Sequence, residues 1–221
     1  MRDYVSIAPA REYTSIWRPS RQIVATHITP VVDQGSFRFR DDDGDETSSG
    51  ATWLDSQAAD VSIDCSAGDV VFRLRIAAAE TAGGFTFNWS SNVEYRLNGG
   101  SWTVLSTSSG PVWSTTASQL TDQADTTDHG VTGTGSWIGA TNGGQSEAIT
   151  VGGLSVDFGG NDYVLFELGL VLKKASVADS DTVEFRLASA DNAASADYPL
   201  LTVIKAAPSV VDDVLFMFGG I

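Results

Sequence analysis

Short runs in which apolar and polar residues alternate recur along most of this chain, and they constrain its fold more than any other feature. A period of two is typical of β-strands that bury one face. Eight or more such strands, separated by turn residues, predict an all-β fold, an antiparallel β-sandwich of jelly-roll type. The runs are SFRFR (36–40), DVVFRLRI (69–76), FTFNW (85–89), NVEYRL (92–97), SWTVLS (101–106), YVLFELGLV (163–171), DTVEFRLA (181–188) and YPLLTVIK (198–205).

The clearest local unit is the hairpin NVEYRLNGGSWTVL. Its residues 98–100, Asn-Gly-Gly, are expected to supply the positive φ angles of a tight turn. Tyr95, Leu97, Trp102 and Val104 are then expected to line the strand faces in pairs.

The chain divides into three segments. Residues 1–35 contain three prolines and show no sustained period, which predicts an extended N-terminal arm. Residues 36–206 form the β-sandwich domain, whose Ser/Thr/Gly-rich stretch 107–153 is expected to be functional or covered by another chain. Residues 207–221 form an apolar C-terminal tail, which we expect to dock on another subunit or to form a last strand, since exposed runs of this kind aggregate.

Charge and composition narrow the classes of partner. The net charge is -15. Basic residues are concentrated in residues 1–40, which contain six arginines and three acidic residues. An acidic body argues against a nucleic-acid partner. No apolar stretch is long enough for a membrane span, and no signal peptide is apparent, so we expect synthesis in a host cytoplasm. Cys65 is the single cysteine and reads as a small buried residue.

The acidic run DDDGDE at 41–46 is the first candidate metal site. An EF-hand needs glycine at position 6 and glutamate at position 12 of the loop, but these positions hold Glu46 and Thr52. A looser calcium site built by Asp41, Asp43 and Asp45 stays possible. An acidic, solvated turn of the sandwich is the better interpretation.

Other candidate sites are weaker. A cluster of three aspartates and one histidine could ligate a metal, but it lies in a Thr-rich segment without helical periodicity and is better explained by turns. His27 is interpreted as structural, and no GxSxG elbow occurs. Trp113 and Trp137 lie in the long loop region and are glycan-binding candidates. The cluster of three aspartates and one histidine consists of Asp122, Asp125, Asp128 and His129.

The stretch FRFRDDDGDETSSGATWL resembles the opening of a β-sandwich module of tailed-phage virion proteins and related bacterial surface proteins. In that module an arginine and aromatic strand runs into an Asp-Asp-Gly-x-Glu-Thr turn and then an Ala-Thr-Trp strand. VFRLRIAAAET, EYRLNGGSWTVL, DTVEFRL and YPLLTVI are similar to later landmarks, so the resemblance covers residues 36–205. It implies a structural or adhesive role rather than catalysis.

These observations together predict a non-enzymatic virion structural protein without a cofactor, most simply a capsid decoration or cement protein. Its partners would be the major capsid protein or other virion proteins, and a homo-oligomer, either a trimer or a ring, is expected. The alternative is a receptor- or glycan-binding module of a head or tail fibre, and a polysaccharide-degrading enzyme ranks third. The expected partner contacts are Arg2, Arg11, Trp17, Arg18, Arg21, Leu215, Phe216 and Phe218.

Overall fold

The computed structural model describes residues 30–46, 51–83, 86–115, 118–121, 125–139, 144–145, 154–190 and 198–206. All eight predicted runs contain a strand. The strands are β1 (Val32–Asp41), β2 (Val61–Asp64), β3 (Val70–Glu80), β4 (Phe87–Ser91), β5 (Val93–Leu97), β6 (Thr103–Val104), β7 (Val112–Ser114), β8 (Ser136–Trp137), β9 (Gly144–Gln145), β10 (Leu154–Phe158), β11 (Asp162–Leu172), β12 (Thr182–Leu187) and β13 (Leu200–Ile204), and one 3-10 turn, η1, spans Lys174–Ser176.

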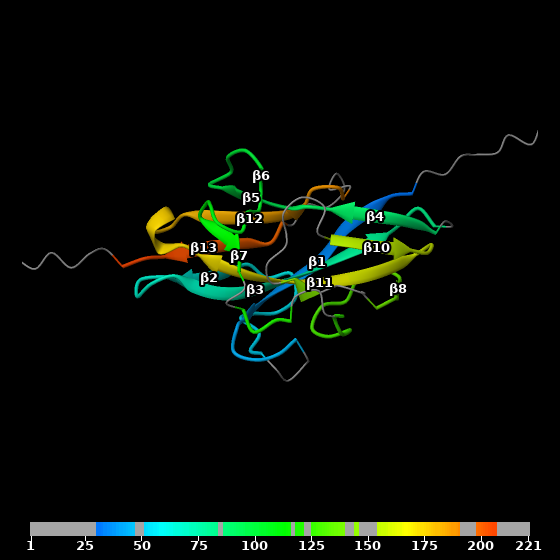
Figure 1. Ribbon diagram of the computed structural model, residues 1–221, viewed down its shortest axis with the longest axis horizontal. Coiled ribbons are helices and arrows are strands. Elements are labelled where there is room, and N and C mark those ends of the chain that lie inside the picture. Colours follow the sequence, from blue (N-terminus) through cyan, green and yellow to red (C-terminus); the bar gives the residue numbers. More distant parts are fainter. Residues whose placement is uncertain are drawn as a thin grey trace, which may run out of the picture.

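Two main sheets form the architecture (Figure 1). Sheet A has the order β1-β3-β11-β7, with β8 and β9 paired to β11, and sheet B has the order β2-β13-β12-β5-β6. β4 and β10 form a separate pair. The pairing is antiparallel except where β2 joins β13 and where β8 and β9 join β11. The expected antiparallel β-sandwich is confirmed. Among the described residues, no helix is long and apolar enough to span a membrane.

Aromatic side chains join the two layers. The ring of Phe39 on β1 lies 6.3 Å from that of Phe185 on β12, and the ring of Phe72 on β3 lies 6.4 Å from it. All three side chains are fully buried. Cys65 is buried in the same core, as expected.

Sheet A is also covered on its outer face. β3 and β11 are buried at nearly every position, on both sides of the sheet. A second small core on that face joins Ala77, Ala79, Tyr163 and Leu165 to Val131 from the long region 107–153. In its described part this region therefore packs against its own domain.

β1 begins at Val32, inside the segment that the sequence assigns to the arm. A bulge shifts the β1–β3 register between Gln34 and Phe37. At the bulge, a Cβ on Gly35 would lie 3.0 Å from the Cβ of Ala77, so glycine lets the strands approach. The bulge inserts an extra residue and interrupts the alternation of apolar and polar residues. The sequence pattern therefore reveals only the part of β1 that follows the bulge.

The β5–β6 hairpin turns at residues 98–100 as predicted, but its side chains face differently from the prediction. The turn at residues 98–100 has positive φ at its first two positions, 50° and 68°, but not at the third. Tyr95 pairs with Thr103, one residue later than a regular two-residue turn would place it. Trp102 and Val104 therefore lie on the outer face while Tyr95 enters the core, and the predicted pairing of these side chains is wrong.

Candidate functional site

Four charged side chains form a buried centre on the outer face of sheet A. Arg40 lies on β1, Arg73 and Arg75 lie on β3, and Glu167 lies on β11, with side chains that are 0% exposed. They alternate with the apolar side chains that face the sandwich core, so the strand period brings all four to one face. We call this group the arginine centre.

One carboxylate bridges the three guanidinium groups. Oε1 of Glu167 accepts hydrogen bonds from Nη1 of Arg40 at 3.1 Å and from Nη1 of Arg73 at 3.4 Å. Oε2 accepts from Nε of Arg75 at 2.7 Å and from its Nη2. A single buried glutamate thus links its own strand, β11, to the adjacent β3 and to β1 beyond it.

The acidic turn supplies the remaining negative charge. Asp42 accepts from Nε of Arg73 at 2.6 Å, and Oε2 of Glu46 accepts from Nη2 of Arg75 at 2.9 Å. The guanidinium groups also donate to main-chain carbonyls of the turn, that of Asp45 at 2.9 Å and that of Glu46 at 3.1 Å. Three arginines therefore meet three carboxylates. Asp42 and Glu46 turn inward over the centre, whereas Asp43 and Asp45 are exposed, as expected for a solvated turn.

The same two acids of the turn hold the long loops in place. Asp42 accepts from the hydroxyl of Ser118 at 2.8 Å and from the main-chain N–H of Gln119 at 3.0 Å. Glu46 accepts from the main-chain N–H of Thr127 at 3.1 Å. The acidic turn consequently joins the arginine centre to segments about 80 residues later in the chain.

Trp53 covers the centre. The guanidinium carbons of Arg40 and Arg38 lie 4.3 and 4.5 Å from the centroid of its ring, a distance typical of cation–π contact. Gly130 approaches the other ring edge so closely that a Cβ there would lie 2.0 Å from Cζ2 of Trp53. Burial lowers the pKa of Arg40, and the neighbouring charge of Glu167 opposes that effect.

The three candidate calcium ligands, Asp41, Asp43 and Asp45, do not act together as one site. Asp43 accepts from the N–H and the hydroxyl of Thr52 at 2.7 and 2.6 Å, and these bonds hold its pKa below the usual value. Burial, and then the charge of Asp43, raise the pKa of Asp41. Neither these two nor Asp45 belongs to a metal-binding group, because no three His, Cys, Asp or Glu side chains are so placed within the described ranges.

The second polar cluster is only partly described, since Asp122 lies outside the described residues. Oδ1 of Asp128 accepts from the hydroxyl of Tyr163 at 2.8 Å. His129 contributes its main-chain carbonyl, which accepts from Nη1 of Arg75 at 2.7 Å. These contacts fix the loop to sheet A, which agrees with the interpretation of this segment as turns.

The two glycan-binding candidates are not brought together. Trp113 on β7 pairs with Val171, and Trp137 on β8 pairs with Tyr163. Eight residues of β11 separate these positions, about 27 Å at strand spacing. Trp113 packs against the Lys173 ammonium group at 4.5 Å, whereas Trp137 is 38% exposed. Of these two described tryptophans, Trp137 is therefore the more accessible.

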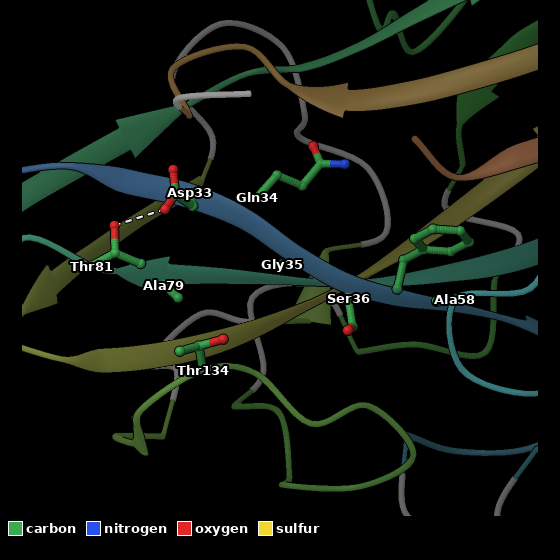
Figure 2. Close-up of a pocket in the computed structure, with 9 residues that line it drawn as sticks. Asp33, Gln34, Gly35, Ser36, Ala58, Ala79, Thr81 and Thr134 are labelled. Carbon is green, nitrogen blue, oxygen red and sulfur yellow. Dashed lines mark hydrogen bonds between the residues drawn. The ribbon is translucent and has the colours of Figure 1, made fainter. Parts of the chain in front are cut away.

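A cleft of about 310 Å³ opens where the β1 bulge meets the covering loops (Figure 2). Small and hydroxyl side chains line it, among them Ser36, Ala79 and Thr134. Asp33 is the one titratable residue in its lining, and its carboxylate accepts from the hydroxyl of Thr81 at 2.7 Å. The cleft lies away from the arginine centre and presents one carboxylate that is already hydrogen-bonded.

The arginine centre was not predicted, although the sequence carries a signal for it. FRFR and FRLR place arginines at alternate positions of two strands, so that they share one face of each strand. YVLFELGLV contains one acid in an otherwise apolar run, which indicates a buried carboxylate with a cationic partner.

The residues proposed to contact partners lie outside the described ranges. They are Arg2, Arg11, Trp17, Arg18 and Arg21 in the expected arm and Leu215, Phe216 and Phe218 in the expected tail. His27 lies outside them as well.

Comparison with known proteins gives no match, whether to a family model, to a curated protein or to a solved structure.

Proposed function

We propose that this chain is a non-enzymatic structural protein of a tailed-phage virion, a capsid decoration or cement protein that binds the head shell. One observation carries the proposal. β1 starts at one end of the long axis of the body and β13 finishes at the other, so residues 1–29 and 207–221 join the sandwich at opposite ends (Figure 1). A domain held by two such segments can bridge neighbouring subunits of a shell.

Charge supports the same role. Residues 1–29 contain four arginines and two acids, whereas the whole chain has a net charge of -15. Within the described body, three of the arginines lie in the arginine centre and are shielded from solvent. The basic segment would therefore bind an acidic protein surface, while the acidic body faces solvent and resists aggregation.

The arginine centre also favours a structural role. Its charged groups bind one another and the main chain of the acidic turn. The charged groups of the arginine centre find these partners within the protein. Together with the acidic turn they fix the long loops on sheet A. A rigid body is what a shell component needs when its ends are anchored on different neighbours.

Binding to shells tests the proposal. Full-length protein and variants lacking residues 1–29 or 207–221 would be co-sedimented with capsids of the source phage prepared without this protein. Two linked contacts raise the apparent affinity by about 100-fold or more over one contact, so each deletion should raise the apparent dissociation constant for the shell by at least that factor. Full retention of both deletion variants, or no binding of the intact chain, contradicts the proposal.

A receptor- or glycan-binding module of a head or tail fibre is the second candidate. The exposed ring of Trp137 favours it, because an open aromatic face is a common platform for a sugar. A glycan array with the intact protein and with Trp137→Ala separates the two functions. Glycan binding that Trp137→Ala abolishes, without binding to capsids, would favour the fibre module.

A further inference from the structure

The outer face of sheet B is accessible, in contrast to that of sheet A. Along β12 and β13, buried side chains alternate with half-buried or exposed ones. β2 shows the same alternation, and so do the first four residues of β5. Both residues of β6 are exposed. Within the described ranges, solvent therefore reaches one whole face of this five-stranded sheet.

Four charges form a checkerboard at the centre of this face. β5 and β12 both read Glu-x-Arg, and their antiparallel register pairs Glu94 with Arg186 and Arg96 with Glu184. Arg96 donates from Nε and Nη2 to the two oxygens of Glu184 at 2.6 and 2.7 Å, and Nε of Arg186 donates to Glu94 at 2.7 Å. Positive and negative groups thus alternate along both strands and across them.

Aromatic and aliphatic side chains surround the checkerboard. Trp102 packs against the guanidinium groups of Arg96 and Arg186, with carbon-to-centroid distances of 4.6 and 4.4 Å. Tyr198 lies 4.9 Å from Trp102 in an edge-to-face arrangement. Tryptophan, tyrosine and arginine are the residues that dominate binding energy at protein interfaces.

The face ends in two exposed apolar side chains. Val104 on β6 is 36% exposed and Ile204 on β13 is 46% exposed, and the register places both on the outer side of the sheet. The two glutamates and two arginines cancel each other, and the outward positions of β6 and β13 carry no charge, so Asp64, the β2 partner of Ile204, leaves the face with one net negative charge. In a chain of net charge -15, a face with a single net negative charge lets two acidic molecules approach each other with little repulsion.

We infer that this face binds the same face of a second copy of the chain, through a two-fold axis that lies in the plane of contact. A checkerboard of this kind is complementary to itself. Rotation by 180° about an axis along or across the strands places each arginine opposite a glutamate of the second copy, and an isologous contact has this symmetry. The inference does not depend on the proposed function, and its two-fold contact differs from the trimer or ring that the sequence suggested.

The size of the face sets the expected strength. Five strands spaced by about 4.8 Å, with two to six residues each, cover at most roughly 20 by 16 Å, or about 320 Å² on each copy, which is below the size of stable specific interfaces and corresponds to a weak, transient contact. We therefore expect a dimer with a dissociation constant in the micromolar range, of the order of 1–100 µM. Because its central contacts are ionic, salt should weaken it.

Sedimentation velocity of the full chain tests the inference. Between about 1 and 300 µM the mass should rise from that of the 23.3 kDa chain to twice that value, and the rise should be smaller in about 0.5 M NaCl than in about 0.05 M. Val104→Glu adds a like charge to each half of the contact and should raise the dissociation constant at least tenfold. Trp137→Glu is the matched control, because it also replaces an exposed apolar side chain but lies on sheet A, and it should dimerise as the wild type does.

Three results would overturn the inference. They are a wild type that is monomeric at every concentration, a Val104→Glu variant that dimerises with unchanged affinity, and loss of the dimer to the same extent in both variants. Circular dichroism of both variants verifies that they are folded, since both substituted side chains are exposed.

Discussion

Glu167 on β11 and Arg75 on β3 are register partners, and Nε of Arg75 lies 2.7 Å from Oε2 of the carboxylate where neither side chain reaches solvent. Taking these charges out of water is costly, and their mutual contacts offset that cost only while both are present. Removing one member should therefore be far more harmful than the modest contribution of an exposed ion pair suggests.

Glu167→Gln is predicted to destabilise the fold by about 3–5 kcal/mol, because it removes the negative charge shared by three buried guanidinium groups. Urea unfolding followed by tryptophan fluorescence measures the change. Glu184→Gln is the matched control, since its pair with Arg96 keeps contact with solvent, with side chains 15% and 27% exposed, and its loss should cost no more than about 1 kcal/mol. Equal losses in the two variants would show that the centre is not a buried ionic network.

Gly130→Ala is predicted to destabilise the protein by about 2–4 kcal/mol, because the new Cβ would overlap the Trp53 ring and Gly130 has a φ of +72°. Gly99→Ala isolates the backbone contribution. Gly99 has a φ of +68° but no atom within 4 Å of the added Cβ, so the loss there should be only about 1 kcal/mol. Urea unfolding of both variants gives the difference, and a Gly130→Ala loss no larger than that of Gly99→Ala contradicts the close packing on Trp53.

The raised pKa of Tyr163 leads us to expect a lower free energy of unfolding at high pH. Burial, and then its hydrogen bond to Asp128, raise the pKa of Tyr163 from 10.0 to about 12. A raised pKa in the folded state means that this contribution is complete below pH 10 and is lost as the pH rises toward 12, by up to about 2–3 kcal/mol. The free energy of unfolding should therefore fall more steeply above about pH 10 for the wild type than for Tyr163→Phe. Parallel curves for the two proteins would contradict this assignment.

The strands were predictable because their period of two follows from burial of one face. The fold class and all eight alternating runs are confirmed on that basis. Five strands, each of five residues or fewer, lie in stretches where polar and small residues dominate and were not predicted: β2, β7, β8, β9 and β10. Bulges and turn offsets, as at Gly35 and in the β5–β6 hairpin, are set by tertiary packing and leave little trace in the pattern.

The candidate site was less predictable than the fold. The acidic run was recognised as a turn, but the partners of Asp42 and Glu46 lie on strands and loops that are distant in sequence. Alternation alone places Arg73 and Arg75 on one face of β3 and says nothing of what covers that face. The covering loops decide whether those charges are solvated or buried, and loop placement depends on contacts between residues far apart in the chain.

Glu80 is predicted to stabilise the junction of two turns. It is the last residue of β3, is 2% exposed, and its carboxylate accepts main-chain N–H groups of Ala82 at 2.9 Å, Gly83 at 3.0 Å and Asn161 at 2.9 Å. Both oxygens are used, and Asn161, with a φ of 60°, lies in the turn between β10 and β11. The carboxylate thus joins two turns separated by about 80 residues of chain.

Glu80→Gln keeps the size of the side chain but replaces one acceptor oxygen by an NH₂ group, which must face main-chain donors. The expected loss is about 1–3 kcal/mol, with faster hydrogen exchange at residues 81–83 and 161 than elsewhere in the body. Asp33→Asn serves as the control, since Asp33 bonds a hydroxyl near the same turn and is only half-buried, and it should leave exchange at residue 161 unchanged. If Glu80→Gln leaves the protection at residue 161 intact, the carboxylate does not couple the two turns.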